Sequence, residues 1–170
     1  MEFWFSEAQT PYVRLHIQVD KQLYSNQSEF QRIDVFESPE FGRFLALDGY
    51  LMLTEKDEFI YHEMITHVPM AVHPNVKDVL VIGAGDGGVV RELTRYPDVQ
   101  KIDMVEIDPM VVEVCKKYLP QTASKLDDPR LTIYYEDGLR FVRTPEDKYD
   151  LIIVDSTDPF GPGEGLFTKE

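Results

Sequence analysis

A glycine-rich turn that carries an acid is the part of this sequence most able to do chemistry. Residues 79–91 read VLVIGAGDGGVVR, in which Gly83, Gly85 and Gly88 fit the pattern G-x-G-x-x-G. Such a turn brings the backbone close to a nucleotide-like ligand. Asp86 lies inside the turn, where its carboxylate would repel the pyrophosphate of a dinucleotide at the following helix N-terminus. The pattern therefore favours a nucleoside with a cationic tail, such as S-adenosylmethionine or a relative of it.

Acidic residues also follow the other strands that we predict in this region. Ligands of open parallel sheets bind at the carboxyl ends of the strands, so these acids are expected to surround one site. Glu106 lies 18 residues beyond Gly88, close to the spacing of an acid that binds ribose hydroxyls. Asp137-Gly138 could accept a hydrogen bond from an adenine amino group. The full set of strand-end acids is Asp86, Glu106, Asp108, Asp137, Asp155 and Asp158.

Each of these acids has a simpler interpretation when it is taken alone. A single acid after a strand is more typical of a helix N-cap or a solvated loop. Asp155 and Asp158 stand three residues apart and could hold an ammonium group, or they could form an Asx-turn before Pro159. Acids at four successive strand ends around one glycine loop favour a binding site.

A short polar segment precedes the glycine loop. Thr54-x-x-Asp57 resembles a capping box and predicts a helix over about residues 55–68, ending near Pro69. His62-Glu63 and His67 approach the zinc motif H-E-x-x-H, but the histidines are five residues apart and do not share a helix face. We therefore predict no metalloprotease site. The residues expected on the buried face of the helix are Ile60, Met64 and Val68.

The elements that must position these residues differ between the two parts of the chain. Apolar residues alternate over 12–19, and Asp48-Gly49 separates two apolar runs, which predicts a hairpin. Another strand is expected over 30–37. Further along, strands are predicted at 76–83, 101–108, 131–137 and 149–156, with helices at about 88–96, 109–118 and 138–144. Strand–helix alternation indicates right-handed crossovers and a parallel sheet.

These patterns predict an α/β fold, with a Rossmann-like parallel sheet of the S-adenosylmethionine-dependent methyltransferase type behind a small antiparallel β domain. Such sheets usually have more than four strands, so we expect the C-terminal part of the sheet to be missing. The predicted parts are an N-terminal antiparallel β domain over 1–55, a linking helix and turn over 56–75, and a truncated nucleoside-binding domain over 76–170.

Composition excludes several classes of partner. The chain has 17 basic and 31 acidic residues and a net charge of −14, which argues against nucleic acid and an anionic membrane. The charge is compatible with a cationic substrate, although many acidic proteins are acidic for solubility alone. Cys115 is the only cysteine, so there is no intrachain disulfide or multi-cysteine metal site. The sequence shows no basic leader and no apolar run of spanning length, and we expect a cytoplasmic location.

Taken together, four motifs resemble the polyamine aminopropyltransferases, the family of spermidine synthase. They are EFIYHEM from residue 58, VLVIGAGDGGVVRE from residue 79, VEID from residue 105 and DSTDPFGP from residue 155. The resemblance implies transfer of an aminopropyl group from decarboxylated S-adenosylmethionine to putrescine, giving spermidine and methylthioadenosine. It implies no metal. It further implies a polyamine substrate and assembly into a homodimer or homotetramer.

The resemblance also implies roles for individual residues. Asp155 matches the proton acceptor of the family. The residues expected at the nucleoside are Gln31, Gly83, Gly85, Asp86, Glu106, Asp137, Gly138 and Pro162. Those expected at the amine are Tyr61, His62, Asp86, Asp155 and Asp158.

Three other functions share some of these features. A methyltransferase acting on a diamine has the same fold, but Asp86 would repel the carboxylate of its methionine tail. An NAD-dependent dehydrogenase is allowed by the glycines and Glu106, and is opposed by Asp86 and the Asp155 loop. An inactive fragment that serves only binding or assembly is the third. The choice between putrescine, cadaverine and agmatine is not readable from the sequence.

Overall fold

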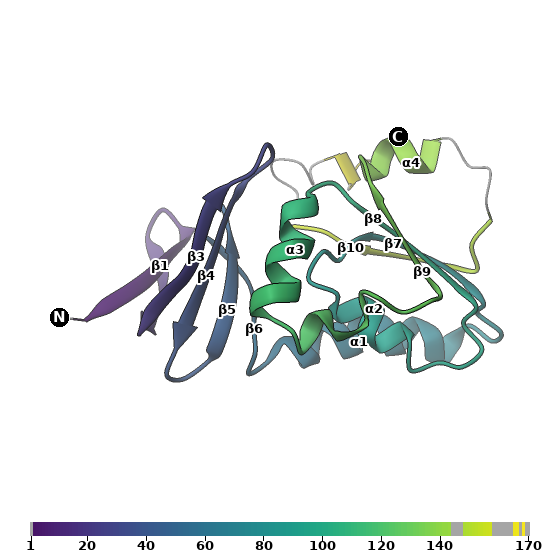
Figure 1. The fold of residues 1–170 in the computed structure, drawn as a ribbon, viewed down its shortest axis with the longest axis horizontal. Helices are drawn as coiled ribbons and strands as arrows, with labels where there is room; N and C mark the ends of the chain where they lie inside the picture. The colour runs from purple at the N-terminus through teal and green to yellow at the C-terminus, as the bar shows by residue number, and fades with distance from the viewer. Residues whose placement is uncertain (1, 144–147, 158–164, 167, 169–170) are drawn as a thin grey trace. The chain divides into compact units, whose positions relative to one another are not determined.

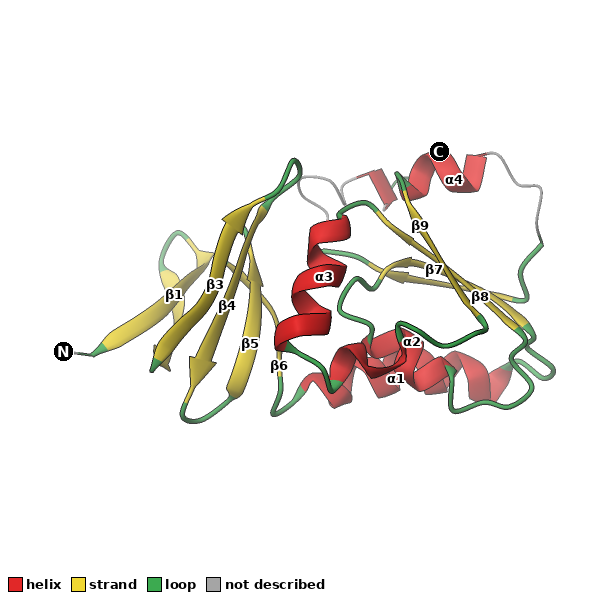
Figure 2. Ribbon diagram, viewed as in Figure 1, coloured by secondary structure: helices red, strands yellow, loops and turns green. Residues whose placement is uncertain are grey.

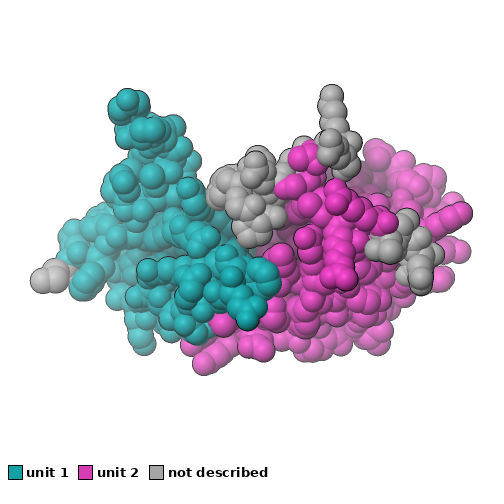
Figure 3. Space-filling view, turned by 90° about the horizontal axis from the view of Figure 1, so that it is seen from above, with its two compact units in different colours: residues 1–59 teal, residues 60–170 magenta. Residues whose placement is uncertain are grey.

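The computed structural model describes residues 2–143, 148–157, 165–166 and 168 (Figure 1). The chain divides into two compact units, Met1–Phe59 and Ile60–Glu170 (Figure 3). The first unit is built from strands, whereas strands and helices alternate in the second (Figure 2). Within the described residues, no helix is long and apolar enough to cross a membrane.

Antiparallel strands form the first unit, as predicted. β1 (Phe3–Thr10) pairs with β2 (Val13–Val19) in a two-stranded sheet. The second sheet contains, in sequence order, β3 (Lys21–Gln27), β4 (Arg32–Ser38), β5 (Gly42–Leu47) and β6 (Tyr50–Thr54). Side chains from both sheets form one core cluster, because period-two alternation turns every second residue inward. Its buried members are Phe5, Ile17, Val19, Phe44 and Ala46.

Turn chemistry fixes the hairpin that joins β5 to β6. Asp48 and Gly49 have φ values of 50° and 83°, and a two-residue hairpin turn of type I′ requires positive φ at both positions. The predicted hairpin is therefore confirmed. β1 and β3 were not predicted, because neither presents a run of buried apolar residues. In β1 the buried Glu7 accepts a hydrogen bond from the Leu51 amide at 2.9 Å, which interrupts the apolar alternation.

A parallel sheet forms the centre of the second unit and confirms the predicted fold class. Its strands are β7 (Asp78–Gly83), β8 (Lys101–Glu106), β9 (Leu131–Tyr135) and β10 (Leu151–Asp155), in the spatial order β10-β7-β8-β9. Chain order reverses at β7, which has β8 on one side and β10 on the other. In open α/β sheets, ligands bind at the carboxyl ends of the strands beside such a switch point.

Helices cover both faces of this sheet. The helical elements are α1 (Glu58–Val72), α2 (Gly88–Leu93), α3 (Pro109–Tyr118), the short 3₁₀ helix η1 (Thr122–Lys125) and α4 (Gly138–Arg143). α1 and α2 lie on one face and α4 on the other (Figure 2). On the α4 face, Leu80, Ile82 and Val105 form a buried cluster against which Phe141 packs.

Helix α1 differs from its prediction in bounds and in orientation. It begins at Glu58, because the Thr54 hydroxyl donates to the Asp57 carboxylate at 2.5 Å within a turn that precedes the helix. It also continues through Pro69, since one proline removes a single helical hydrogen bond and the His73 amide still bonds to the Pro69 carbonyl at 3.0 Å.

The prediction that Ile60, Met64 and Val68 are buried was wrong. These residues share one face, as their spacing requires, but each is more than half exposed. The buried residues of α1 are His62 and Thr66. His62 contacts the Asp86 carboxylate, whereas the buried Thr66 hydroxyl has no hydrogen-bond partner among the described residues, so apolarity alone does not decide which face of α1 turns inward.

Candidate functional site

The glycine loop lies directly against the end of β10. The Ala84 amide donates to the Asp155 carbonyl at 2.9 Å. Gly83 has φ of +87°, and a Cβ added there would lie 2.0 Å from the same carbonyl oxygen. Only glycine meets both conditions, because other residues rarely adopt this φ and carry an atom where the Asp155 carbonyl lies. The first glycine of the motif thus brings the loop and Asp155 together.

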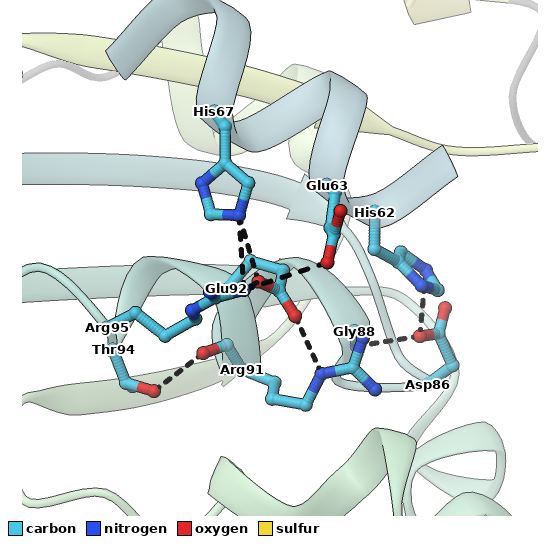
Figure 4. A network of polar contacts seen from close by, with 9 residues as sticks. All are labelled: His62, Glu63, His67, Asp86, Gly88, Arg91, Glu92, Thr94 and Arg95. Atoms are coloured by element: carbon cyan, nitrogen blue, oxygen red, sulfur yellow. Dashed lines mark hydrogen bonds and ion pairs between the residues drawn. The ribbon is translucent and has the colours of Figure 1, made fainter. Parts of the chain in front are cut away.

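Asp86 is held inside the loop by two contacts. Its Oδ1 accepts a hydrogen bond from the Gly88 amide at 2.7 Å and lies 3.3 Å from the His62 Nε2 (Figure 4). The His62 ring is only 2% exposed. A Cβ at Gly88 would lie 2.3 Å from the His62 Cε1, so the third glycine of the motif makes room for this imidazole. His62 is therefore an interior partner of Asp86, not a surface histidine.

Asp155 has one carboxylate oxygen in use and one open. Its Oδ1 accepts a hydrogen bond from the Tyr61 hydroxyl at 2.9 Å, whereas its Oδ2 is buried and has no hydrogen-bond partner among the described residues. Burial, reinforced by the Asp86 carboxylate, raises the pKa of Asp155 to about 7, although His62 and the Tyr61 hydroxyl act in the opposite direction. A buried acceptor without a donor is costly, which makes this oxygen a natural contact for a ligand donor.

His62, Asp86 and Asp155 lie close enough together to hold a cation. One ligand atom from each lies within 4.8 Å of the other two. Two carboxylates at such a distance repel each other in a partly dry environment, and a positive guest would relieve that repulsion. An ammonium group and a metal ion both meet this requirement.

Glu106 is the second buried acid at the loop. Its Oε1 accepts a hydrogen bond from the Asp108 amide at 2.9 Å, and the Gly85 amide also bonds to the carboxylate. A Cβ at Gly85 would lie 2.8 Å from the Glu106 Oε2, so the second glycine allows this close approach. Burial raises the pKa of Glu106 to about 7, against the effect of the Asp108 amide and with the help of the Asp108 and Asp86 charges.

Two other strand-end acids cap helices. Asp108 accepts a hydrogen bond from the Met110 amide at 3.0 Å at the start of α3. Asp137 accepts one from the Leu139 amide at 2.8 Å at the start of α4, and its side chain is exposed. Gly138 lies against β7, where a Cβ would be 2.5 Å from the Ile82 Cγ2. The adenine contact expected for Asp137 and Gly138 remains a prediction.

Three predicted site residues remain, Gln31, Asp158 and Pro162. Asp158 and Pro162 lie outside the described residues. Gln31 belongs to the first unit, where it is buried in the turn before β4. Its backbone amide donates a hydrogen bond to the Ser28 hydroxyl at 3.0 Å. Their roles at the nucleoside and the amine stay predictions.

A second cluster of polar side chains, which was not predicted from the sequence, lies between α1 and α2. Its centre is Glu92, which is 3% exposed (Figure 4). Glu92 Oε1 accepts from the Arg91 Nε at 2.9 Å, and Oε2 accepts from the Arg95 Nη1 at 2.6 Å and from the His67 Nε2 at 3.0 Å. Burial alone would raise the pKa of Glu92, but the hydrogen bonds from Arg95 and Arg91 lower it below its ordinary value.

Comparison with known proteins follows the same division of the chain. The model of the spermine/spermidine synthase domain matches residues 58–170, and that of the spermidine synthase tetramerisation domain matches residues 3–55. A polyamine aminopropyltransferase of Alkaliphilus oremlandii is 74% identical over 170 residues, and one of Clostridium perfringens is 71% identical. Each alignment covers 100% of this chain and 60% of the relative, so the chain spans well under two thirds of these relatives.

Solved structures give the same result. A spermidine synthase crystallised with the transition state analogue AdoDATO has a TM-score of 0.95 and 49% identity, covering 98% of this chain and 57% of that one. Spermidine synthase of Thermotoga maritima has a TM-score of 0.88 and 48% identity, covering 91% and 54%. Fold and site define a Rossmann-like protein with an acidic site at the switch point of its sheet. The chain belongs to the spermine/spermidine synthase family.

Proposed function

We propose that this chain carries the reaction centre of a polyamine aminopropyltransferase, which transfers an aminopropyl group from decarboxylated S-adenosylmethionine to putrescine. The products are spermidine and methylthioadenosine. The observation that carries the proposal is the Asp155 Oδ2 beside the Asp86 carboxylate, a buried oxygen with no hydrogen-bond partner among the residues that the structure describes. The names of the relatives and the solved spermidine synthases support the same reaction class.

The reaction brings positive groups together, and the acids offset that cost. Putrescine is mostly doubly protonated at neutral pH, because a primary amine has a pKa near ~10.4. Two unit charges ~4 Å apart at an effective dielectric of ~20 interact by about 4 kcal/mol, so an ammonium near a sulfonium is strongly repelled. In our proposal, Asp86 binds the aminopropyl ammonium, and Asp158 binds the distal ammonium of putrescine.

Asp155 is the proposed acceptor for the attacking nitrogen. Proton transfer from an amine to an ordinary aspartate costs roughly 9 kcal/mol, a figure that follows from pKa values of about 10.4 and 3.9. With the pKa of Asp155 raised to about 7, the same transfer costs roughly 5 kcal/mol. The Tyr61 hydroxyl occupies Oδ1 and leaves Oδ2 for the nitrogen, which then attacks the carbon next to the sulfonium in line with the leaving sulfur.

The nucleoside is proposed to lie along the glycine loop. Glu106 would accept hydrogen bonds from the ribose hydroxyls, and Asp137-Gly138 would contact the adenine, with Gln31 and Pro162 completing the site. Assembly would use the first unit, whose sequence matches a tetramerisation domain, and we propose a homotetramer. We also propose a cytoplasmic location, where the two substrates would be available.

Incubation with each nucleoside separates this function from its nearest alternative. The chain is mixed with putrescine and either decarboxylated or ordinary S-adenosylmethionine, and the amine product is identified by mass spectrometry. An added aminopropyl group, formed only with the decarboxylated nucleoside and unchanged by EDTA, is expected. An added methyl group would instead show a diamine methyltransferase, and absence of both products together with no methylthioadenosine binding would favour an incomplete or structural fragment.

A further inference from the structure

Helix α1 contacts α2 at both ends of α2 through two different histidines. At the start of α2, His62 packs on Gly88 and reaches Asp86. At its end, His67 reaches Glu92 and, through Nδ1, the Tyr96 hydroxyl at 2.7 Å. Figure 4 shows both imidazoles pointing from α1 toward α2.

The spacing of the two histidines along α1 is close to the spacing of the residues that they contact on α2. Five residues of α1 rise by about 7.5 Å, and the four residues from Gly88 to Glu92 rise by about 6 Å. Two contacts at this separation fix both the position of α1 along α2 and its rotation. The carboxylate of Glu92 accepts only, so His67 donates to it from Nε2.

The Glu92 carboxylate accepts its hydrogen bonds from side chains of this chain. Both oxygens are bonded to arginine or histidine, and the side chain is buried. Arg95 also lies 3.7 Å from the Glu63 carboxylate of α1, which adds a weaker link between the two helices. The cluster therefore links α1 to α2 and to the turn that follows α2.

We propose that Glu92 is a positioning residue, which through His67 holds α1 on α2 so that His62 and Tyr61 keep Asp86 and Asp155 in place. The inference rests on the proposed function, because it assigns Glu92 to the same reaction centre. The positions of Tyr61 and His62 depend directly on the orientation of α1. The Tyr61 hydroxyl lies 2.9 Å from the Asp155 Oδ1, and the His62 Nε2 lies 3.3 Å from the Asp86 Oδ1. A shift of α1 by about 1 Å would carry both beyond hydrogen-bond range, and misplacement on this scale can cost about 100-fold in rate.

Glu92→Gln tests the proposal with little change in volume. The matched control is Glu113→Gln, the same substitution at an exposed position of α3. Three quantities are measured on each chain: the ring nitrogen signals of His62 by NMR without ligand, the dissociation constant of methylthioadenosine, and kcat for spermidine formation. We expect Glu92→Gln to move the His62 signals and to lower kcat at least tenfold, while methylthioadenosine affinity stays within twofold. Glu113→Gln should leave all three unchanged.

A second variant keeps the test decisive if Glu92→Gln does not fold. His67→Phe retains a ring against Tyr96 and leaves Glu92 paired with both arginines, but removes the bond between the helices. It should move the His62 signals in the same direction and lower kcat several-fold. Unmoved His62 signals in a folded variant, or losses of kcat and methylthioadenosine affinity that only follow the folded fraction, would overturn the proposal.

Failure of the proposed function has a different signature. If the unsubstituted chain forms no aminopropylated amine, the reaction assignment fails. The His62 signals need no substrate, so they decide the role of Glu92 independently of that result.

Discussion

Two clusters in the second unit contain the same kinds of side chain and have opposite electrostatics. His62, Asp86 and Asp155 gather at the glycine loop, and Glu63, His67 and Glu92 gather between α1 and α2. Arginines complete the second cluster and lower the pKa of Glu92, whereas burial and a neighbouring carboxylate raise the pKa of Asp155. Glu92, whose charge is balanced by arginines, joins structural elements. Asp86 and Asp155, which have no arginine partner among the described residues, leave room for a cation. The charge balance of a cluster thus separates a structural site from a ligand site.

Asp155→Asn gives the strongest test of this contrast. It removes the proposed proton acceptor while keeping the size of the side chain, and it should lower spermidine formation about 1000-fold, within the range for loss of an acid–base group. Methylthioadenosine affinity, measured by calorimetry, should change less than twofold. Asp127→Asn, at a side chain that is 87% exposed, is the control and should retain full activity. Near-normal turnover of Asp155→Asn would show that the open carboxylate is not used.

Gly88→Ala tests the packing that joins the first cluster to α1. A methyl group there would lie 2.3 Å from a buried imidazole, so His62 must leave its position. We expect the free energy of unfolding to fall by about 2 kcal/mol, as for other overpacked interiors, together with a change in the His62 NMR signals. Urea unfolding measures the first effect. Wild-type stability with unmoved His62 signals would contradict this account of the third glycine.

The pH dependence of stability should differ in sign between the two clusters. Asp155 and Glu106 have raised pKa values of about 7, so the unliganded native chain binds more protons than the unfolded chain between about pH 4 and 7. Their contribution is present below about pH 4 and is lost as pH rises through about 7, by roughly 4 kcal/mol for each acid, because one pKa unit corresponds to about 1.4 kcal/mol. Glu92, with its lowered pKa, contributes stability that is lost as pH falls below about 4.5.

Difference curves separate the two contributions. The unfolding free energy of Asp155→Asn or Glu106→Gln, subtracted from that of the parent chain, should decline from pH 4 to 7. The same difference in unfolding free energy for Glu92→Gln should instead decrease as pH falls below about 4.5. If the two differences in unfolding free energy changed with pH in the same direction, the proposed electrostatic difference between the clusters would be wrong.

Tyr61→Phe should have the smallest effect. The Tyr61 hydroxyl lowers the pKa of Asp155, so its removal raises that pKa further. The acid limb of the pH–rate profile should move to higher pH, and turnover at neutral pH should fall by about threefold to tenfold, the value of one hydrogen bond. An unshifted acid limb would mean that Asp155 does not set it.

The sequence predicted the elements that repeat a simple pattern. The parallel strands, α3 and the Asp48-Gly49 hairpin follow from periodicity and turn chemistry, and the acids of the glycine loop follow from where strands end. Burial on α1 was predicted wrongly because apolarity favours the Ile60 face, whereas the structure buries His62 with its specific partner Asp86. The Glu92 cluster escaped prediction because its members come from two helices and from residues that usually lie at the surface. One signal was available, the pair of histidines at the non-metal spacing of five.

The contact between Gly88 and His62 has a consequence for how these positions can vary. The two residues are 26 positions apart, yet each fixes what the other can be. Alanine at position 88 would place a methyl group where the His62 ring lies, and shortening His62 to alanine would remove that clash. The pair is thus epistatic, and a change at either position is neutral or harmful depending on the other. The motif G-x-G-x-x-G in this chain is therefore a constraint on helix α1 as much as on its own loop.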